Sequence, residues 1–116
     1  MSGGITGTDM DSRIEIKEGV LFKQLNLHFV AFIEVVIHAW DLFAPSVIPV
    51  ITSANDGKHM DGSFHYKNLA WDLRTKNLAA GKVEEIAHML RVNLGSDWDI
   101  VVESTHLHCE YDRRFV

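Results

Sequence analysis

The chain has 116 residues, 47% of them hydrophobic, and a formal net charge of −5. This length and composition predict one compact domain that folds without disulfides, and its single cysteine cannot form an internal bridge. The acidic balance argues against a nucleic-acid-binding protein, which needs clustered Lys and Arg. We also expect a monomer.

The N-terminal segment, residues 1–12, is rich in Gly, Thr, Ser and Asp, and we expect a flexible leader there, with the domain in residues 13–116. It has neither the basic flank nor the apolar run of a signal peptide, so we expect synthesis in the cytoplasm. Residues 13–17 alternate apolar and polar side chains, which predicts a short strand or an extended segment.

The longest apolar stretch, residues 22–43, predicts a central buried helix that ends before Pro45. A membrane span needs about 20 mostly apolar residues, and ionisable side chains interrupt this stretch, so we expect no membrane partner. These side chains are His28, Glu34, His38 and Asp41.

Two strands are predicted on either side of a loop that carries His59 and His65. Residues 47–52 indicate a strand that Pro49 would confine to a sheet edge or a bulge. Residues 53–58 have the composition of a turn, and residues 68–74 indicate the second strand.

The C-terminal part predicts a helix and two more extended segments. Apolar residues at helical spacing place a helix at 82–94, with Gly95 as its stop. Residues 98–103 predict a third strand, and residues 107–111 a fourth strand or a continuation of the third past a kink. This order of elements predicts a small single α+β domain, an antiparallel sheet packed against two or three helices.

Four of the seven histidines fall in two clusters, residues 59–72 and residues 103–110, together with carboxylates. Imidazole and carboxylate ligands suit zinc, and a hydrolytic zinc site has three protein ligands and one open position. The side chains in question are His59, His65, Asp72, Glu103, His106, His108 and Glu110.

Strand periodicity makes a specific prediction about the second cluster. If residues 105–110 are extended, both histidines and Glu110 lie on one face, and Cys109 points into the core. Glu103 has the opposite parity to His108, so bringing both to one metal would require a bulge near residues 104–105.

Non-functional interpretations of these residues stay open. A His-x-His pair also occurs in ordinary strands, and His65 with Asp72 could be a hydrogen-bonded core pair. The histidines on the predicted helices are more typical of surface residues or hydrogen-bonded core residues than of metal ligands. The tryptophans are typical of core packing. These residues are His28, His38, His88, Trp40, Trp71 and Trp98.

Two motifs carry a resemblance to a known family. Residues 63–72, Ser-x-His-x-x-Asn-x-Ala-x-Asp, resemble the Ser-x-His-x-x-Gly-x-Ala-x-Asp signature of zinc D-alanyl-D-alanine carboxypeptidases, D-Ala-D-Ala dipeptidases and phage peptidoglycan endopeptidases. Residues 103–108, Glu-x-x-His-x-His, resemble their second signature, and the hedgehog signalling domain shares the same zinc cradle. The resemblance covers about residues 47–111.

This resemblance implies a hedgehog/DD-peptidase-like fold with one catalytic Zn²⁺ held by His65, Asp72 and His108. The spacing in the dipeptidase-like members would instead choose His106 as the third ligand. The carboxypeptidase and hedgehog patterns choose His108, and so does the shared parity with Glu110.

The same resemblance implies catalytic roles for Glu103 as general base and for His106 or His59 in stabilising the oxyanion. Ser63 and Arg74 are expected to bind substrate.

Many family members carry an arginine in a Ser-Gly-Tyr-Arg turn that holds a substrate carboxylate. Here the turn is Ser-Ala-Asn-Asp at residues 53–56, so a carboxylate clamp would come from Lys58, Arg74 or elsewhere.

The function implied is a zinc metallopeptidase, a hydrolase that cleaves peptidoglycan stem peptides as a carboxypeptidase or an endopeptidase. A small chain without a signal fits a phage or prophage endolysin that a separate factor releases to the cell wall. The alternative is a non-catalytic, zinc-stabilised binding module of the hedgehog-like type, in which zinc chiefly adds folding free energy.

Overall fold

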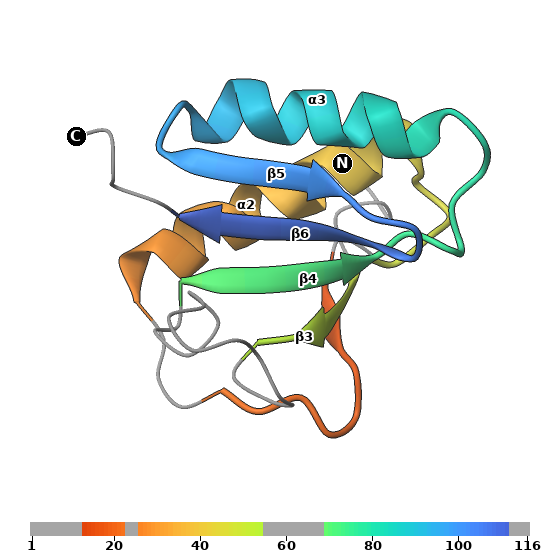
Figure 1. The fold of residues 1–116 in the computed structure, drawn as a ribbon. Coiled ribbons are helices and arrows are strands. Elements are labelled where there is room, and N and C mark those ends of the chain that lie inside the picture. The colour runs from red at the N-terminus through yellow and green to blue at the C-terminus, as the bar shows by residue number, and fades with distance from the viewer. Residues whose placement is uncertain (1–12, 23–25, 55–68, 112–116) are drawn as a thin grey trace, which may run out of the picture.

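The computed structural model describes residues 13–22, 26–54 and 69–111. In this part of the chain, two helices pack against a five-stranded sheet (Figure 1). The elements are β2 (Glu15–Ile16), α2 (Leu27–Phe43), β3 (Val50–Ser53), β4 (Ala70–Arg74), α3 (Lys82–Leu94), β5 (Trp98–Val102) and β6 (His106–Tyr111). The α+β class predicted from the sequence is therefore confirmed.

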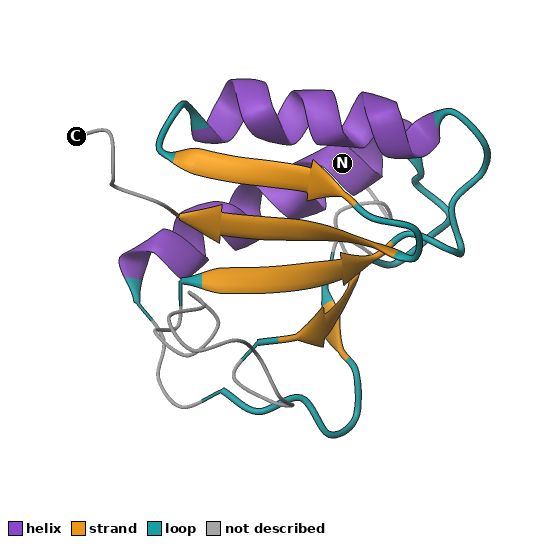
Figure 2. Cartoon of the chain, in the orientation of Figure 1, coloured by secondary structure: helices purple, strands orange, loops and turns teal. Residues whose placement is uncertain are grey.

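The sheet has the strand order β2-β3-β4-β6-β5. The sequence predicts an antiparallel sheet, but the observed sheet is mixed. Three of its four pairings are antiparallel, but β2 runs parallel to β3. A parallel pair needs a long crossover connection, and here α2 supplies it between the two strands. Figure 2 shows the β5–β6 turn and the C-terminal end of β4 at the same end of this sheet.

Helix α2 begins later than the apolar pattern predicts. The side-chain oxygen of Asn26 accepts a hydrogen bond from the Phe29 backbone N–H (3.1 Å) and so caps the helix. The helix ends at Phe43, before Pro45, as predicted. Neither helix that the structure describes combines the length and the apolar character needed to cross a membrane.

Helix α3 has the bounds that its periodicity predicts. Gly95 follows it with φ of 93°, a left-handed backbone that glycine adopts at little cost, and this ends the helix. Its apolar face, Ile86, Ala87 and Leu90, is completely buried.

Strand β3 corrects one expectation. Because β2 pairs with it on one side and β4 on the other, β3 is not an edge strand. Pro49 lies just before the strand, and its carbonyl accepts a hydrogen bond from the Glu15 N–H (2.9 Å). The register with β4 shifts between Ile51 and Ser53, so an irregularity does occur close to the proline.

The two faces of the sheet differ in character. On β6, Leu107 and Cys109 are fully buried under the helices, whereas the histidines and Glu110 are only partly buried. Phe32 of α2 stacks on the indoles of Trp71 and Trp98, at centroid distances of 5.3 and 5.5 Å, and the two indoles contact each other at 5.9 Å.

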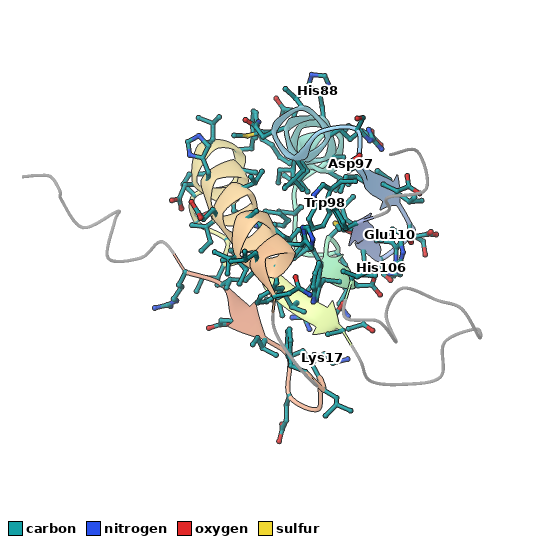
Figure 3. The ribbon with its side chains drawn as sticks, turned by 90° about the vertical axis from the view of Figure 1, so that its left-hand side faces the viewer. Lys17, His88, Asp97, Trp98, His106 and Glu110 are labelled. Atoms are coloured by element: carbon teal, nitrogen blue, oxygen red, sulfur yellow. The ribbon has the colours of Figure 1, made fainter. Side chains whose placement is uncertain are left out.

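This arrangement places the site residues on the far face. Figure 3 shows Trp98 between the helices and the sheet, and shows His106 and Glu110 pointing away from the helices. The tryptophans pack in the core as expected, and the predicted parity of β6 is confirmed.

Candidate functional site

The centre of the site is a cross-strand pair of side chains. Asp72 on β4 is the direct register partner of His108 on β6. Directly opposed residues of an antiparallel pair project to the same face, and here Asp72 Oδ1 lies 3.0 Å from His108 Nδ1. Only 9% of Asp72 is exposed, so this carboxylate is largely removed from water.

A second carboxylate holds the other side of the same imidazole. His108 Nε2 lies 2.6 Å from Glu110 Oε1, two residues further along β6. An ionised carboxylate only accepts hydrogen bonds, so both ring nitrogens of His108 must donate when no metal is bound. The hydrogen bond with Asp72 raises the pKa of His108 to about 9; burial opposes this, and Glu110 adds to it.

His106 lies next to this pair on the same face. Its Nε2 is 3.8 Å from Asp72 Oδ2, and its Nδ1 is 3.2 Å from the Thr105 hydroxyl. The two carboxylate oxygens of Asp72 therefore face different histidines. Together with Glu110, the structure brings together four of the residues that the sequence nominated.

Glu103 reaches this face by a route other than the predicted bulge. Residues 104–105 form a tight turn between β5 and β6, and the Glu103 N–H donates to the His106 carbonyl (2.9 Å). In the hairpin register Val102 pairs with Leu107, so Glu103 lies opposite His106 and on the same face. The bulge prediction is wrong because parity counted along one strand does not apply across a turn.

A pocket of about 270 Å³ opens beside Asp72 and His106. Arg74, the last residue of β4 and the register partner of His106, lines it, as do Lys17 and Lys76. The sequence interpretation missed both lysines, and no local pattern marks them. Only the sheet order brings Lys17, which follows β2, to this position.

The other histidines and the cysteine lie elsewhere. His38 and His88 are exposed on the helices, and His28 stacks on Tyr111 with ring centroids 3.8 Å apart. Cys109 is fully buried, and burial raises the pKa of its thiol well above the usual value, so it behaves as a small core hydrophobe.

The predicted residues His59, Ser63 and His65 lie outside the described residues, as does the predicted leader at residues 1–12. Within residues 13–22, 26–54 and 69–111, no group of three or more His, Cys, Asp or Glu side chains is arranged to hold a metal ion. The predicted ligand set depends on His65, so this search leaves the zinc prediction untested.

A scan of the chain against protein-family models found no match, and a search of curated proteins found none either. A functional assignment therefore depends on the residues and their geometry. The motifs at residues 63–72 and 103–108 and the Asp72–His108 pair are the features that support one.

Proposed function

We propose that this chain is a zinc-dependent peptidase that cleaves peptide bonds in bacterial peptidoglycan stems, beside D-alanine or between L-alanine and D-glutamate. The observation that carries the proposal is the Asp72–His108 pair, with Glu110 behind it, on the sheet face away from the helices. The proposal includes synthesis in the cytoplasm and release to the wall by a separate factor, as in phage lysis.

The donor types and the spacing at this pair support zinc as the metal. Asp72 Oδ1 and His108 Nδ1 are 3.0 Å apart, close to the roughly 3.3 Å that separates two ligands of a tetrahedral zinc with bonds of about 2.0–2.1 Å. Metal-binding histidines commonly donate their second N–H to a carboxylate, and Glu110 occupies that position. His65 would be the third protein ligand, and zinc would replace the proton that His108 Nδ1 shares with Asp72.

A zinc ion at this pair would polarise the substrate carbonyl and acidify a water molecule. Glu103 would accept a proton from the attacking water and return it to the leaving amine. His106, whose Nε2 faces the same carboxylate as His108, would donate a hydrogen bond to the oxyanion.

Metal analysis tests the first part of this proposal. Protein purified with added zinc should hold about one equivalent, and His65→Ala or Asp72→Ala should lose it, because each removes a ligand. His88→Ala is the matched control, since this histidine is exposed on α3. Less than about a tenth of an equivalent in the unaltered protein would refute a resident zinc.

Digestion of purified cell walls tests the second part. After incubation with the zinc-loaded protein, mass spectrometry of the digest should reveal both products of hydrolysis, a shortened muropeptide and a fragment with a new amine, which is either free D-alanine or a stem peptide. Glu103→Gln should keep the metal and lose turnover by at least about 100-fold, because a general base is removed. If zinc is bound but no new amine appears, a wall peptidase is excluded.

The 3.8 Å between His106 Nε2 and Asp72 Oδ2 supports a second candidate, the non-catalytic zinc module. There His106 or His59 would be a fourth protein ligand and close the site. Melting of Glu103→Gln separates the two candidates: a catalytic glutamate gives an inactive variant of equal or higher stability. The non-catalytic module is favoured if Glu103→Gln melts well below the wild-type protein and the wild-type protein itself shows no hydrolysis.

A further inference from the structure

The pocket beside Asp72 and His106 contains an unusual concentration of positive charge for an acidic chain. Lys17, Arg74 and Lys76 line it, whereas the chain as a whole has a net charge of −5. Among the described residues that line the pocket, Asp72 is the one carboxylate, and His108 already engages it at 3.0 Å. The pocket is therefore locally cationic.

Two separate segments supply these cations, residue 17 after β2 and residues 74–76 at the end of β4, and a backbone hydrogen bond ties each of them to a neighbouring segment. The Lys17 N–H donates to the Ile51 carbonyl of β3 (2.9 Å). Arg74 is the last residue of β4, and the Thr75 N–H donates to the Thr105 carbonyl of the β5–β6 turn (3.1 Å). The cations are thus presented by a rigid end of the sheet.

In the part of the chain that the structure describes, Lys17, Arg74 and Lys76 form no ion pair or hydrogen bond through their side chains. Hydroxyl groups of Thr52, Ser53 and Thr105 also line the pocket. The Thr52 hydroxyl donates to the Asp72 carbonyl (3.5 Å), and the Thr105 hydroxyl lies 3.2 Å from His106 Nδ1. A volume of about 270 Å³ equals roughly nine water molecules at about 30 Å³ each, room for a carboxylate and a small side chain.

We propose that this pocket binds a carboxylate of the substrate and that Lys17 and Lys76 make it selective for that charge. The inference rests on the proposed peptidase function, because Asp72 and His106 belong to both the pocket and the candidate reaction centre. A carboxylate held here lies next to the bond to be cleaved. It could come from the C-terminus of the peptide or from an acidic residue within the stem.

Binding to the zinc-loaded Glu103→Gln chain and to the zinc-free wild-type chain tests the inference by calorimetry without turnover. The first probe pair is N-acetyl-D-alanine and its C-terminal amide. The second is an N-acetyl-L-Ala-D-Glu dipeptide and the same dipeptide with both carboxylates amidated. We expect an acid to bind about tenfold more tightly than its amide, equivalent to about 1.4 kcal/mol.

Substitutions identify the groups responsible. Lys17→Ala and Lys76→Ala should each weaken this preference, and the double variant should remove it in both the zinc-free and zinc-loaded proteins. Lys82 is a half-exposed α3 lysine that pairs with Glu85 at 3.2 Å, and Lys82→Ala should leave the preference unchanged. A preference in the first probe pair assigns a C-terminal carboxylate, and one in the second pair alone assigns an internal acid.

Two results would overturn the inference: equal affinity for acids and amides in the unaltered pocket, or a preference that survives in the double lysine variant. The second result would mean that zinc or another group binds the carboxylate. Failure of the proposed function is measured separately, by zinc content and muropeptide release. If the protein binds no zinc or shows no hydrolytic activity, the zinc-free titrations still measure whether the pocket prefers acids to amides.

Discussion

At the scale of single residues, the decisive feature is that His108 has a carboxylate at each ring nitrogen, at 3.0 and 2.6 Å. This arrangement has two states in which both ring nitrogens of His108 are satisfied. In one the imidazole is protonated, and in the other a metal replaces the proton facing Asp72. A neutral, metal-free imidazole would leave one nitrogen lone pair against a carboxylate oxygen.

The stability of the metal-free protein should therefore depend on pH. The pKa of His108 is raised from 6.5 to about 9, so its stabilising effect is complete below pH 6.5 and is lost as the pH rises through 9. The side chain is 23% exposed, so we discount the full shift for solvent screening and expect a loss of about 1–2 kcal/mol. Thermal melts of chelator-treated protein at pH 6 and pH 10 measure this loss of stability. We expect the melting temperature to be roughly 5 °C lower at pH 10.

The Glu110→Gln variant is the matched comparison for that experiment. It retains a side chain of the same shape but lacks the charge that helps to keep His108 protonated. The fall in melting temperature should then be smaller and begin at a lower pH. A pH profile identical to that of the unaltered protein would show that the pair does not control this titration.

At the scale of elements, the β5–β6 hairpin contributes both to the site and to the protection of the sheet. Its turn brings Glu103 opposite His106, as the backbone hydrogen bond from the Glu103 N–H to the His106 carbonyl indicates. Its other strand, β5, is at the edge of the described sheet. Arg91 of α3 covers that edge, because its Nε and one terminal nitrogen donate to the Ile100 carbonyl at 3.3 and 2.9 Å.

Removal of this cover should have two effects. Arg91→Ala should lower the free energy of unfolding by about 1 kcal/mol, because a charge-assisted contact to a carbonyl is lost. The uncovered edge should also promote concentration-dependent self-association. Urea unfolding and light scattering measure the two effects, and Arg91→Lys, which keeps one donor group, should fall between wild type and Arg91→Ala. Unchanged unfolding and scattering would show that the contact has no protective role.

At the scale of the whole molecule, the aromatic core supports the face that carries the site. Trp71, which stacks on Phe32, directly precedes Asp72 in β4. Phe32→Ala should therefore destabilise the fold by about 3–5 kcal/mol, the usual range for a fully buried phenylalanine. Val30→Ala, on the half-exposed side of α2, is the control and should cost less than about 0.5 kcal/mol.

That experiment also tests the dependence of the site on the core. Zinc should partly restore the melting temperature of Phe32→Ala, because a ligand that binds only the folded state stabilises it by mass action. If Phe32→Ala and Val30→Ala melt alike, the aromatic stack is not a main source of stability.

The sequence predicts the local features of this molecule well and its long-range features poorly. The bounds of α3 and the alternating faces of β6 follow from periodicity, which is a property of neighbouring residues. The parallel pairing of β2, the approach of Lys17 and the placement of Glu103 depend on which segments lie side by side. No pattern within a single segment encodes these contacts, so the pocket and the hairpin route to the site were not anticipated.

The alternation along β4 and β6 also limits how this chain can vary in length. Asp72 lies between two core residues of β4, and His108 between Leu107 and Cys109 of β6. One inserted or deleted residue within either strand would exchange the faces of all residues beyond it, with imidazole and carboxylate entering the core and leucine entering the site. Insertions and deletions in related chains should therefore occur in the connections between strands, or in pairs within a strand.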